Sequence, residues 1–168
     1  MRFQAVTQDG DEINLKSSIA TETLEKFRRS PWEFQQTFET PLKNLDSFVK
    51  AILSAVEAVQ SGSFSIDQVV FEPTDLISLL ESHSIRPEYR HGLCLIAEAQ
   101  SEVEQLLRTV LSEWIDFLFV PQPESFAIFA DHDEYSTFYA HNRANLDRLA
   151  SALSEQGFKA VTDYERHF

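Results

Sequence analysis

The chain has 168 residues, of which 43% are hydrophobic and 14 are phenylalanine, so it can bury a substantial core. This composition excludes a disordered protein, and only 4 glycines and 6 prolines interrupt it, which favours long secondary-structure elements. A net charge of −13 disfavours direct binding to nucleic-acid phosphates or to an anionic membrane surface.

The first 29 residues predict a β-hairpin followed by a helix. Between residues 2 and 16, apolar and polar residues alternate on both sides of a turn at residues 8–11. The centre of this turn is an Asp-Gly pair, which is typical of tight hairpins because glycine adopts positive φ without strain. Residues 17–29 then predict a helix, whose apolar positions are Ile19, Leu24 and Phe27.

A capping box predicts a short helix at residues 31–39. Ser30 is a suitable N-cap, Pro31 suits the first helical position, and Glu33 completes the box. A longer helix follows, because one apolar stripe runs at spacings of three and four residues: Leu45, Phe48, Val49, Ile52, Val56 and Val59. The Ser-Gly-Ser stretch at residues 61–63 is predicted to end this helix.

The middle of the chain predicts further helices joined by short connections. Residues 64–71 fit either a short strand or an extended connection, and Pro73 begins a small helix. Residues 84–90 predict a loop, because Pro87 biases the residue before it away from helix. A second long helix is predicted at residues 93–112, with an apolar stripe of Ile96, Ala99, Val103, Leu106 and Val110.

Three strands, the last two joined by a tight turn, are predicted before the last helix. A first strand is predicted at residues 115–120, and Pro121 interrupts it. The aromatic, β-favouring runs at residues 126–130 and 135–140 are separated by four polar residues, which predicts a hairpin with an acidic tip.

The end of the chain predicts a helix and a last strand. Asn142 is a suitable cap for a helix with apolar positions at Leu146, Leu149, Ala150 and Leu153, and Gly157 follows its end. Residues 158–164 alternate between apolar and polar positions, as a strand does. We therefore predict a single α+β domain over residues 1–168. Its antiparallel sheet combines the N-terminal hairpin with a C-terminal β-β-β-α-β unit, and its helices pack mainly on one face.

The densest group of ionisable residues is the predicted hairpin tip, residues 131–134. Carboxylates and an imidazole can bind a divalent ion or transfer protons, and His141 is a further candidate. Four adjacent residues of a turn cannot all point at one centre, however, and His141 lies at the far end of the return strand. We interpret the tip as a solvated turn or a partner contact and assign no metal ligand. The candidate contact residues are Asp131, His132, Asp133, Glu134 and Tyr135.

No other motif predicts catalysis or a cofactor. His91 and Cys94 would share one face of a helix, but a Cys-His pair needs an orienting group and an oxyanion hole, and neither can be placed. Cys94 lies among apolar residues, which favours a buried thiol. A phosphate-binding glycine loop and a serine nucleophile motif are both missing. We therefore expect no catalytic residue and no cofactor, and we favour a protein that is not an enzyme.

The cysteine content and the apolar runs predict the compartment. Cys94 is the single cysteine, which excludes an internal disulfide, and the first residues lack a signal-peptide pattern, so we expect a cytoplasmic protein. The longest wholly apolar run, residues 117–120, is too short to cross a bilayer, so we expect no membrane contact.

The negative charge is concentrated in the middle of the chain. Residues 51–142 hold 15 acidic side chains and three arginines, whereas residues 1–50 have a net charge of −1 and residues 143–168 a net charge of zero. An acidic surface favours solubility, and it also attracts a basic partner. We therefore predict a small acidic binding protein, such as an immunity-type or adaptor inhibitor of a basic protein, for example a nuclease. Two alternatives stay open: a small metal-dependent hydrolase that uses residues 131–134, and a homo-oligomeric structural protein that pairs exposed strand edges.

Overall fold

The computed structural model describes residues 27, 29, 32–56, 59–83 and 93–166. The elements in chain order are β1 (Phe34–Glu39), a short 3-10 turn (Leu42–Asn44), α2 (Leu45–Ala55), β2 (Ser61–Gln68), α3 (Thr74–Ser82), β3 (Cys94–Ala97), α4 (Gln100–Ser112), β4 (Asp116–Gln122), β5 (Ala127–Ala130), β6 (Tyr135–Ala140), α5 (Arg143–Glu155) and β7 (Ala160–Val161). The hairpin predicted at residues 2–16 and the loop predicted at residues 84–90 lie outside the described residues. Of the helix predicted at residues 17–29, Phe27 and Arg29 are described, and both are helical.

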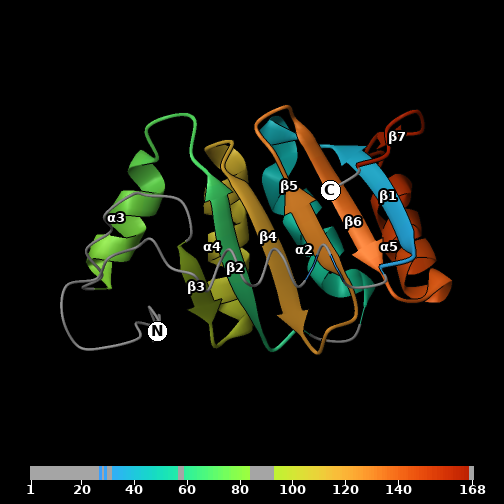
Figure 1. Ribbon diagram of the computed structural model, residues 1–168, viewed down its shortest axis with the longest axis horizontal. Coiled ribbons are helices and arrows are strands. Elements are labelled where there is room, and N and C mark those ends of the chain that lie inside the picture. Colours follow the sequence, from blue (N-terminus) through green and yellow to red (C-terminus); the bar gives the residue numbers. More distant parts are fainter. Residues whose placement is uncertain (1–26, 28, 30–31, 57–58, 84–92, 167–168) are drawn as a thin grey trace.

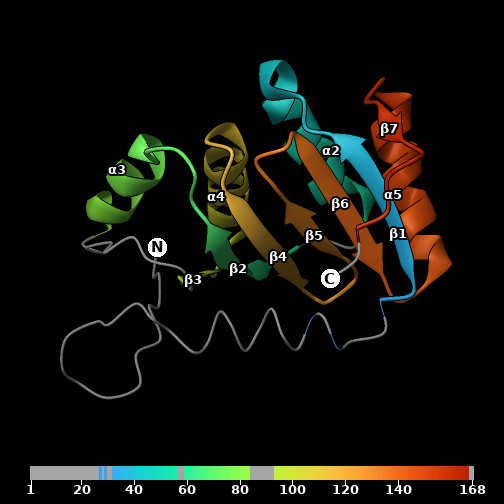
Figure 2. The same ribbon diagram turned by 45° about the horizontal axis from the view of Figure 1, so that its top comes forward.

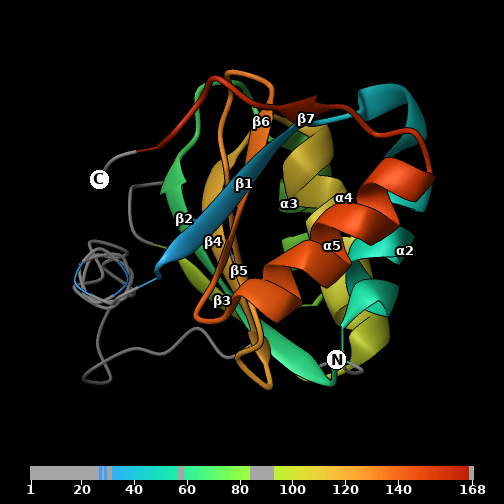
Figure 3. The same ribbon diagram turned by 90° about the vertical axis from the view of Figure 1, so that its right-hand side faces the viewer.

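One antiparallel sheet organises the described part of the chain. Its strand order is β3-β2-β4-β5-β6-β1-β7, and every neighbouring pair is antiparallel. Figure 3 shows α2, α3, α4 and α5 on one side of this sheet. In Figures 1 and 2, α3 lies near the β3 end of the sheet, and α5 lies beside β1 and β7. The predicted α+β class, with an antiparallel sheet and helices mainly on one face, is confirmed.

The face of the sheet that is covered by helices forms the main core. Alternate strand residues point into it and are fully buried, among them Phe64, Phe117, Phe119, Ile128 and Phe138. The apolar stripes of α2 and α4 pack against these residues, as their spacing of three and four predicted. Burial of aromatic side chains between two layers is the main stabilising contribution to this fold.

The opposite face of the sheet, which we call the second face, carries fewer buried apolar side chains than the face that the helices cover. Leu118, Phe129 and Tyr139 form a separate cluster there, on which Phe27 packs edge-to-face with Tyr139 at a ring distance of 5.1 Å. On the same face, where Thr137 lies opposite Phe129, a buried hydrogen bond of 2.9 Å joins the hydroxyls of Thr37 and Thr137. The second face therefore has an apolar part and a polar part, and the polar part carries the candidate site.

The helix predicted at residues 31–39 is wrong, because Phe34–Glu39 is the strand β1. This strand pairs with β6 on one side and with β7 on the other. Phe38 is buried on the face that the helices cover, and Thr37 is buried on the second face. Successive residues of β1 therefore alternate between the two faces of the sheet. Hydrogen bonds on both sides of the strand outweigh the helix-capping preference of the residues before it.

The N-terminal part of the helix predicted at residues 93–112 is also wrong. Residues 94–97 form the strand β3, and α4 begins at Gln100. Leu95 and Ala97 alternate into the core and pair with β2, while Val103, Leu106 and Val110 form the stripe that was predicted. The Glu102 carboxylate accepts a hydrogen bond of 2.8 Å from the Glu98 backbone N–H, which helps to fix the break between strand and helix.

Two predicted boundaries differ from those in the structure. The helix α2 ends at Ala55, so the Ser-Gly-Ser stretch begins β2 instead of ending a helix. A glycine is required at position 62, because a Cβ there would lie 2.5 Å from Cε2 of Phe119 in the neighbouring strand β4. Pro121 lies within β4, which continues to Gln122, so this proline does not end the strand as predicted.

The predicted C-terminal β-β-β-α-β order is confirmed. The strands β4, β5 and β6 form an antiparallel meander, and the Asn142 side chain caps α5 by accepting from the Asn145 N–H at 2.9 Å. The last strand is shorter than predicted, since β7 has two residues and pairs with β1. Within the described ranges, α2 to α5 are all too short or too polar to cross a membrane.

Candidate functional site

The four residues of the predicted acidic tip form the turn between β5 and β6, but Asp131 points inward. Its side chain is only 5% exposed, and Oδ1 accepts hydrogen bonds from the backbone N–H groups of Asp133 (3.0 Å) and Tyr135 (3.3 Å). The turn is closed by Glu134, which has a φ of 71°, and whose carbonyl accepts from the Thr40 N–H at 2.8 Å. Asp131 therefore fixes the shape of the tip.

His132 binds a carboxylate from another strand. Asp116, the first residue of β4, accepts from the His132 backbone N–H at 2.8 Å, and its oxygens lie 2.8 and 3.1 Å from His132 Nδ1. The hydrogen bond to Asp116 raises the pKa of His132 above its ordinary value of 6.5. The ring is one-third exposed, whereas the Asp116 side chain is 9% exposed. This pair can exchange a proton with solvent.

The pair of Asp116 and His132 makes stability depend on pH. Because the folded-state pKa of His132 is raised, the pair stabilises the fold below about pH 6.5, and the contribution is lost as the pH rises through the raised pKa. In a double-mutant cycle of Asp116→Asn and His132→Gln, we expect a coupling energy of about 0.5–1 kcal/mol at about pH 5 and about zero at about pH 9. Urea denaturation measures the coupling, and equal values at the two pH values would contradict the assignment.

Arg166 completes the site from the end of the described chain. An ion pair joins its Nη2 to Asp131 Oδ2, and its guanidinium lies 4.5 Å from the centre of the Phe129 ring. The side chain is 16% exposed, and burial lowers the pKa of Arg166, against which the charges of Asp116 and Asp67 act. Arg166 is thus a buried cation within a group of carboxylates.

Asp133, Glu134 and Tyr135 form the outward part of the tip. Asp133 is 75% exposed and Glu134 is exposed, while the ring of Tyr135 is half-buried against the ring of Tyr164 at 4.9 Å. Burial and the nearby Asp133 carboxylate raise the pKa of Tyr164, so this ring stays neutral. The five predicted site residues are therefore adjacent in space, but Asp131 and His132 have internal partners and the other three present a surface.

Among the described residues, the side chains around the tip do not form a group of metal ligands. Among the residues that the structure describes, no group of three or more His, Cys, Asp and Glu side chains has the geometry of a metal site. His141 lies at the other end of β6, where its ring stacks on Trp32 at 3.8 Å. Cys94 is in a strand, and burial raises the pKa of its thiol, while His91 lies outside the described residues.

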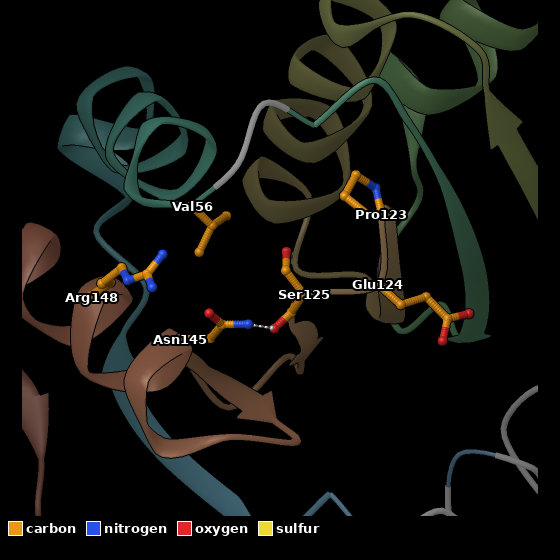
Figure 4. A pocket seen from close by; sticks show the side chains of 6 residues that line it. All are labelled: Val56, Pro123, Glu124, Ser125, Asn145 and Arg148. Carbon is orange, nitrogen blue, oxygen red and sulfur yellow. Dashed lines mark hydrogen bonds between the residues drawn. The ribbon is translucent and has the colours of Figure 1, made fainter.

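A hollow of about 270 Å³ lies between α5 and the connection from β4 to β5 (Figure 4). It is lined by Val56, Pro123, Glu124, Ser125, Asn145 and Arg148. Asn145 Nδ2 donates to the Ser125 carbonyl at 2.9 Å, which joins α5 to the connection before β5. The hollow is separate from the tip, because Ser125 precedes β5 and the tip follows it.

Sequence reasoning found the tip but missed Asp116, Asp67 and Arg166. Asp116 could have been predicted from the meander, which pairs Phe117 with Ala130 and so brings the preceding residue beside Asp131. Arg166 lies beyond residues 158–164, whose alternation predicts a strand, and no local signal predicts its contact with Asp131. Comparison of the chain with protein-family models, with curated proteins and with solved structures gave no match.

Proposed function

We propose that the protein is a small acidic binding protein whose β5–β6 tip contacts a basic protein, as an immunity-type or adaptor inhibitor would. The observation that supports this most is the pair of exposed carboxylates, Asp133 and Glu134, on a turn that is fixed by Asp131. A rigid turn loses little entropy on binding, so its carboxylates are effective contacts.

The aromatic pair beside the carboxylates adds contact area. Tyr135 and Tyr164 are each partly exposed, and their rings contact one another in a tilted arrangement with a centroid distance of 4.9 Å. Tyrosine contributes strongly at interface centres, and surrounding carboxylates increase the rate of encounter with a basic protein. A nuclease is a suitable partner, because carboxylates on the inhibitor can occupy the places that substrate phosphates would take.

The proposal is tested by capture from a native lysate with three immobilised proteins. These are the wild type, an Asp133→Asn/Glu134→Gln tip variant, and a Glu124→Gln/Glu155→Gln control that removes the same charge from exposed positions elsewhere. We expect the wild type and the control to capture a basic protein, and the tip variant to bind it about tenfold more weakly. Binding should fall between about 0.05 and 0.5 M salt. No captured protein, or one that all three bind equally at both salt concentrations, contradicts the proposal.

The two alternatives have less support from the described residues. A metal-dependent hydrolase would use Asp131, whose oxygens already bind the turn and Arg166. Elemental analysis of protein that is purified without chelator tests this alternative, because a metal-dependent hydrolase should contain a divalent ion. A homo-oligomer that pairs strand edges would use β3 or β7, which have four and two residues, and short edge strands are poor templates for pairing.

A further inference from the structure

Arg166 is bound on the second face of the sheet by contacts to both its side chain and its backbone. Figure 3 shows that the segment after β7 passes to the side of the sheet opposite the helices. There the guanidinium lies over the Phe129 ring at 4.5 Å and within 5.7 Å of the Tyr164 ring, and Nη2 pairs with Asp131. A flat aromatic surface and a carboxylate together fit the planar, charged group of arginine better than the ammonium of lysine.

The backbone of Arg166 is bound by one side chain of β1. Gln35 Oε1 accepts from the Arg166 N–H at 3.1 Å, and Gln35 Nε2 donates to the Arg166 carbonyl at 3.4 Å. This pair of bonds imitates the pairing of a neighbouring strand and would accept the backbone of any extended residue. Together, Gln35, Phe129 and Asp131 recognise an arginine residue within a peptide chain.

The resident arginine does not satisfy the site fully. Asp131 is its ion-pair partner, whereas Asp116, which binds His132, and Asp67 act on it through their charges. Its Nε is buried and has no hydrogen-bond partner among the described residues. An unpaired buried donor is costly, so the bound state of Arg166 is less stable than a fully paired guanidinium would be.

The segment that carries Arg166 can leave without disturbing the core. Lys159, Ala160 and Val161 bind β1 and precede this segment, in which Thr162, Asp163 and Glu165 are exposed. Displacement of this segment would move Tyr164 away together with Arg166, and it would uncover Asp131 and the rings of Phe129 and Tyr135 in the immediate neighbourhood of Asp133 and Glu134. The exposed tip and the site of Arg166 would then form one acidic surface.

We propose that Gln35, Phe129 and Asp131 form an arginine-binding site, which Arg166 occupies in the free protein and which takes an arginine from an extended segment of the partner. This inference rests on the proposed function for the identity of the ligand as a basic protein. The internal arginine then competes with the partner, and it keeps weakly basic chains out of the site.

Small blocked amino acids test the site on the full chain. The probes are N-acetyl-arginine methylamide and, as control, N-acetyl-lysine methylamide, and NMR amide shifts report binding. We expect Arg166→Ala to bind the arginine probe at least about tenfold more tightly than the wild type or an Arg148→Ala control, and more tightly than it binds the lysine probe. Shifts should centre on residues 129–135. Arg166→Ala/Asp131→Asn, in which Asn keeps an oxygen for the turn, should lose this binding. Equal binding by Arg166→Ala and the wild type, or no binding of the arginine probe to Arg166→Ala at about 10 mM, overturns the inference.

A second measurement needs no substitution. The Arg166 N–H donates to Gln35 in the free protein, so its hydrogen exchange should be slowed. Adding the arginine probe to the wild type should speed exchange in the C-terminal segment, whereas the lysine probe should not. Unchanged exchange at saturating arginine probe overturns displacement.

The probe-binding and capture experiments together distinguish a failure of the arginine site from a failure of the proposed function. If Arg166→Ala binds the arginine probe but no basic protein is captured from lysate, the site stands and the proposed function fails. If a basic protein is captured with tip-dependent affinity that Gln35→Ala leaves unchanged, the function stands and the arginine site fails as its contact.

Discussion

Replacing Phe138 by alanine should lower the free energy of unfolding by about 3–5 kcal/mol. Phe138 lies in β6 and has no solvent exposure. Its ring contacts Phe38 of β1 edge-to-face at a centroid distance of 5.8 Å and Phe48 of α2 at 6.2 Å, so it joins two strands to a helix. Truncation removes these contacts and leaves a cavity that rigid neighbours cannot fill. Urea denaturation followed by circular dichroism measures the change.

The same substitution at Phe71 is the matched control. Its side chain is 57% exposed in the connection between β2 and α3, so Phe71→Ala should change the free energy of unfolding by less than about 0.5 kcal/mol. If the two variants lose similar stability, the packing of β6 against α2 is wrong, and with it the assignment of the helix-covered face.

The elements that the sequence predicted correctly are those whose local signals agree with their tertiary partners. The hairpin of β5 and β6 has an aromatic pattern, a polar turn and an internal pairing, all within one short stretch. The helix α5 has an N-cap at Asn142 and a left-handed Gly157 after its end, with a φ of 81°. Because these signals are local, a single sequence is enough to recognise them.

The strands β1 and β3 were missed because their partners are distant in the sequence. Phe34 and Phe38 of β1 fit both a helix and a strand, and the choice is made by pairing with β6, about 100 residues later. The residues of β3 belong to an apolar run that continues toward α4, and only their pairing with β2 separates them. Local periodicity cannot distinguish a short buried strand from the first turn of a helix.

The candidate site also has one part that local sequence signals predict and another part that distant residues determine. The turn at residues 131–134 follows from its own polar residues, and Asp131 bonds the backbone as such turns do. The internal partners of the turn, Asp116 and Arg166, come from other elements, and they decide which carboxylates face solvent. The number of exposed charges at the tip was therefore not accessible from the turn sequence alone.

Asp131→Ala should lower the free energy of unfolding by about 3 kcal/mol, although it removes a small polar side chain from a turn. Two backbone N–H groups, those of Asp133 and Tyr135, lose their acceptor. The guanidinium of Arg166, which is 16% exposed, loses its ion-pair partner and remains over Phe129 as a buried charge. Breaking such a pair from one side costs more than the pair itself contributes, because the remaining charge is desolvated. Urea denaturation at neutral pH gives the value.

The substitutions of the two partners should not cost the same. Arg166→Ala should cost about 1–2 kcal/mol, because Asp131 keeps its two backbone donors and stays partly satisfied. Adding Arg166→Ala to Asp131→Ala should recover part of the loss, since the buried charge is then removed. Asp133→Ala is the matched control at a 75% exposed position, where we expect a change of less than about 0.5 kcal/mol. If Asp131→Ala is as mild as this control, Arg166 is not bound at the tip in solution, and the surface that carboxylates and aromatic rings present there is open without any displacement.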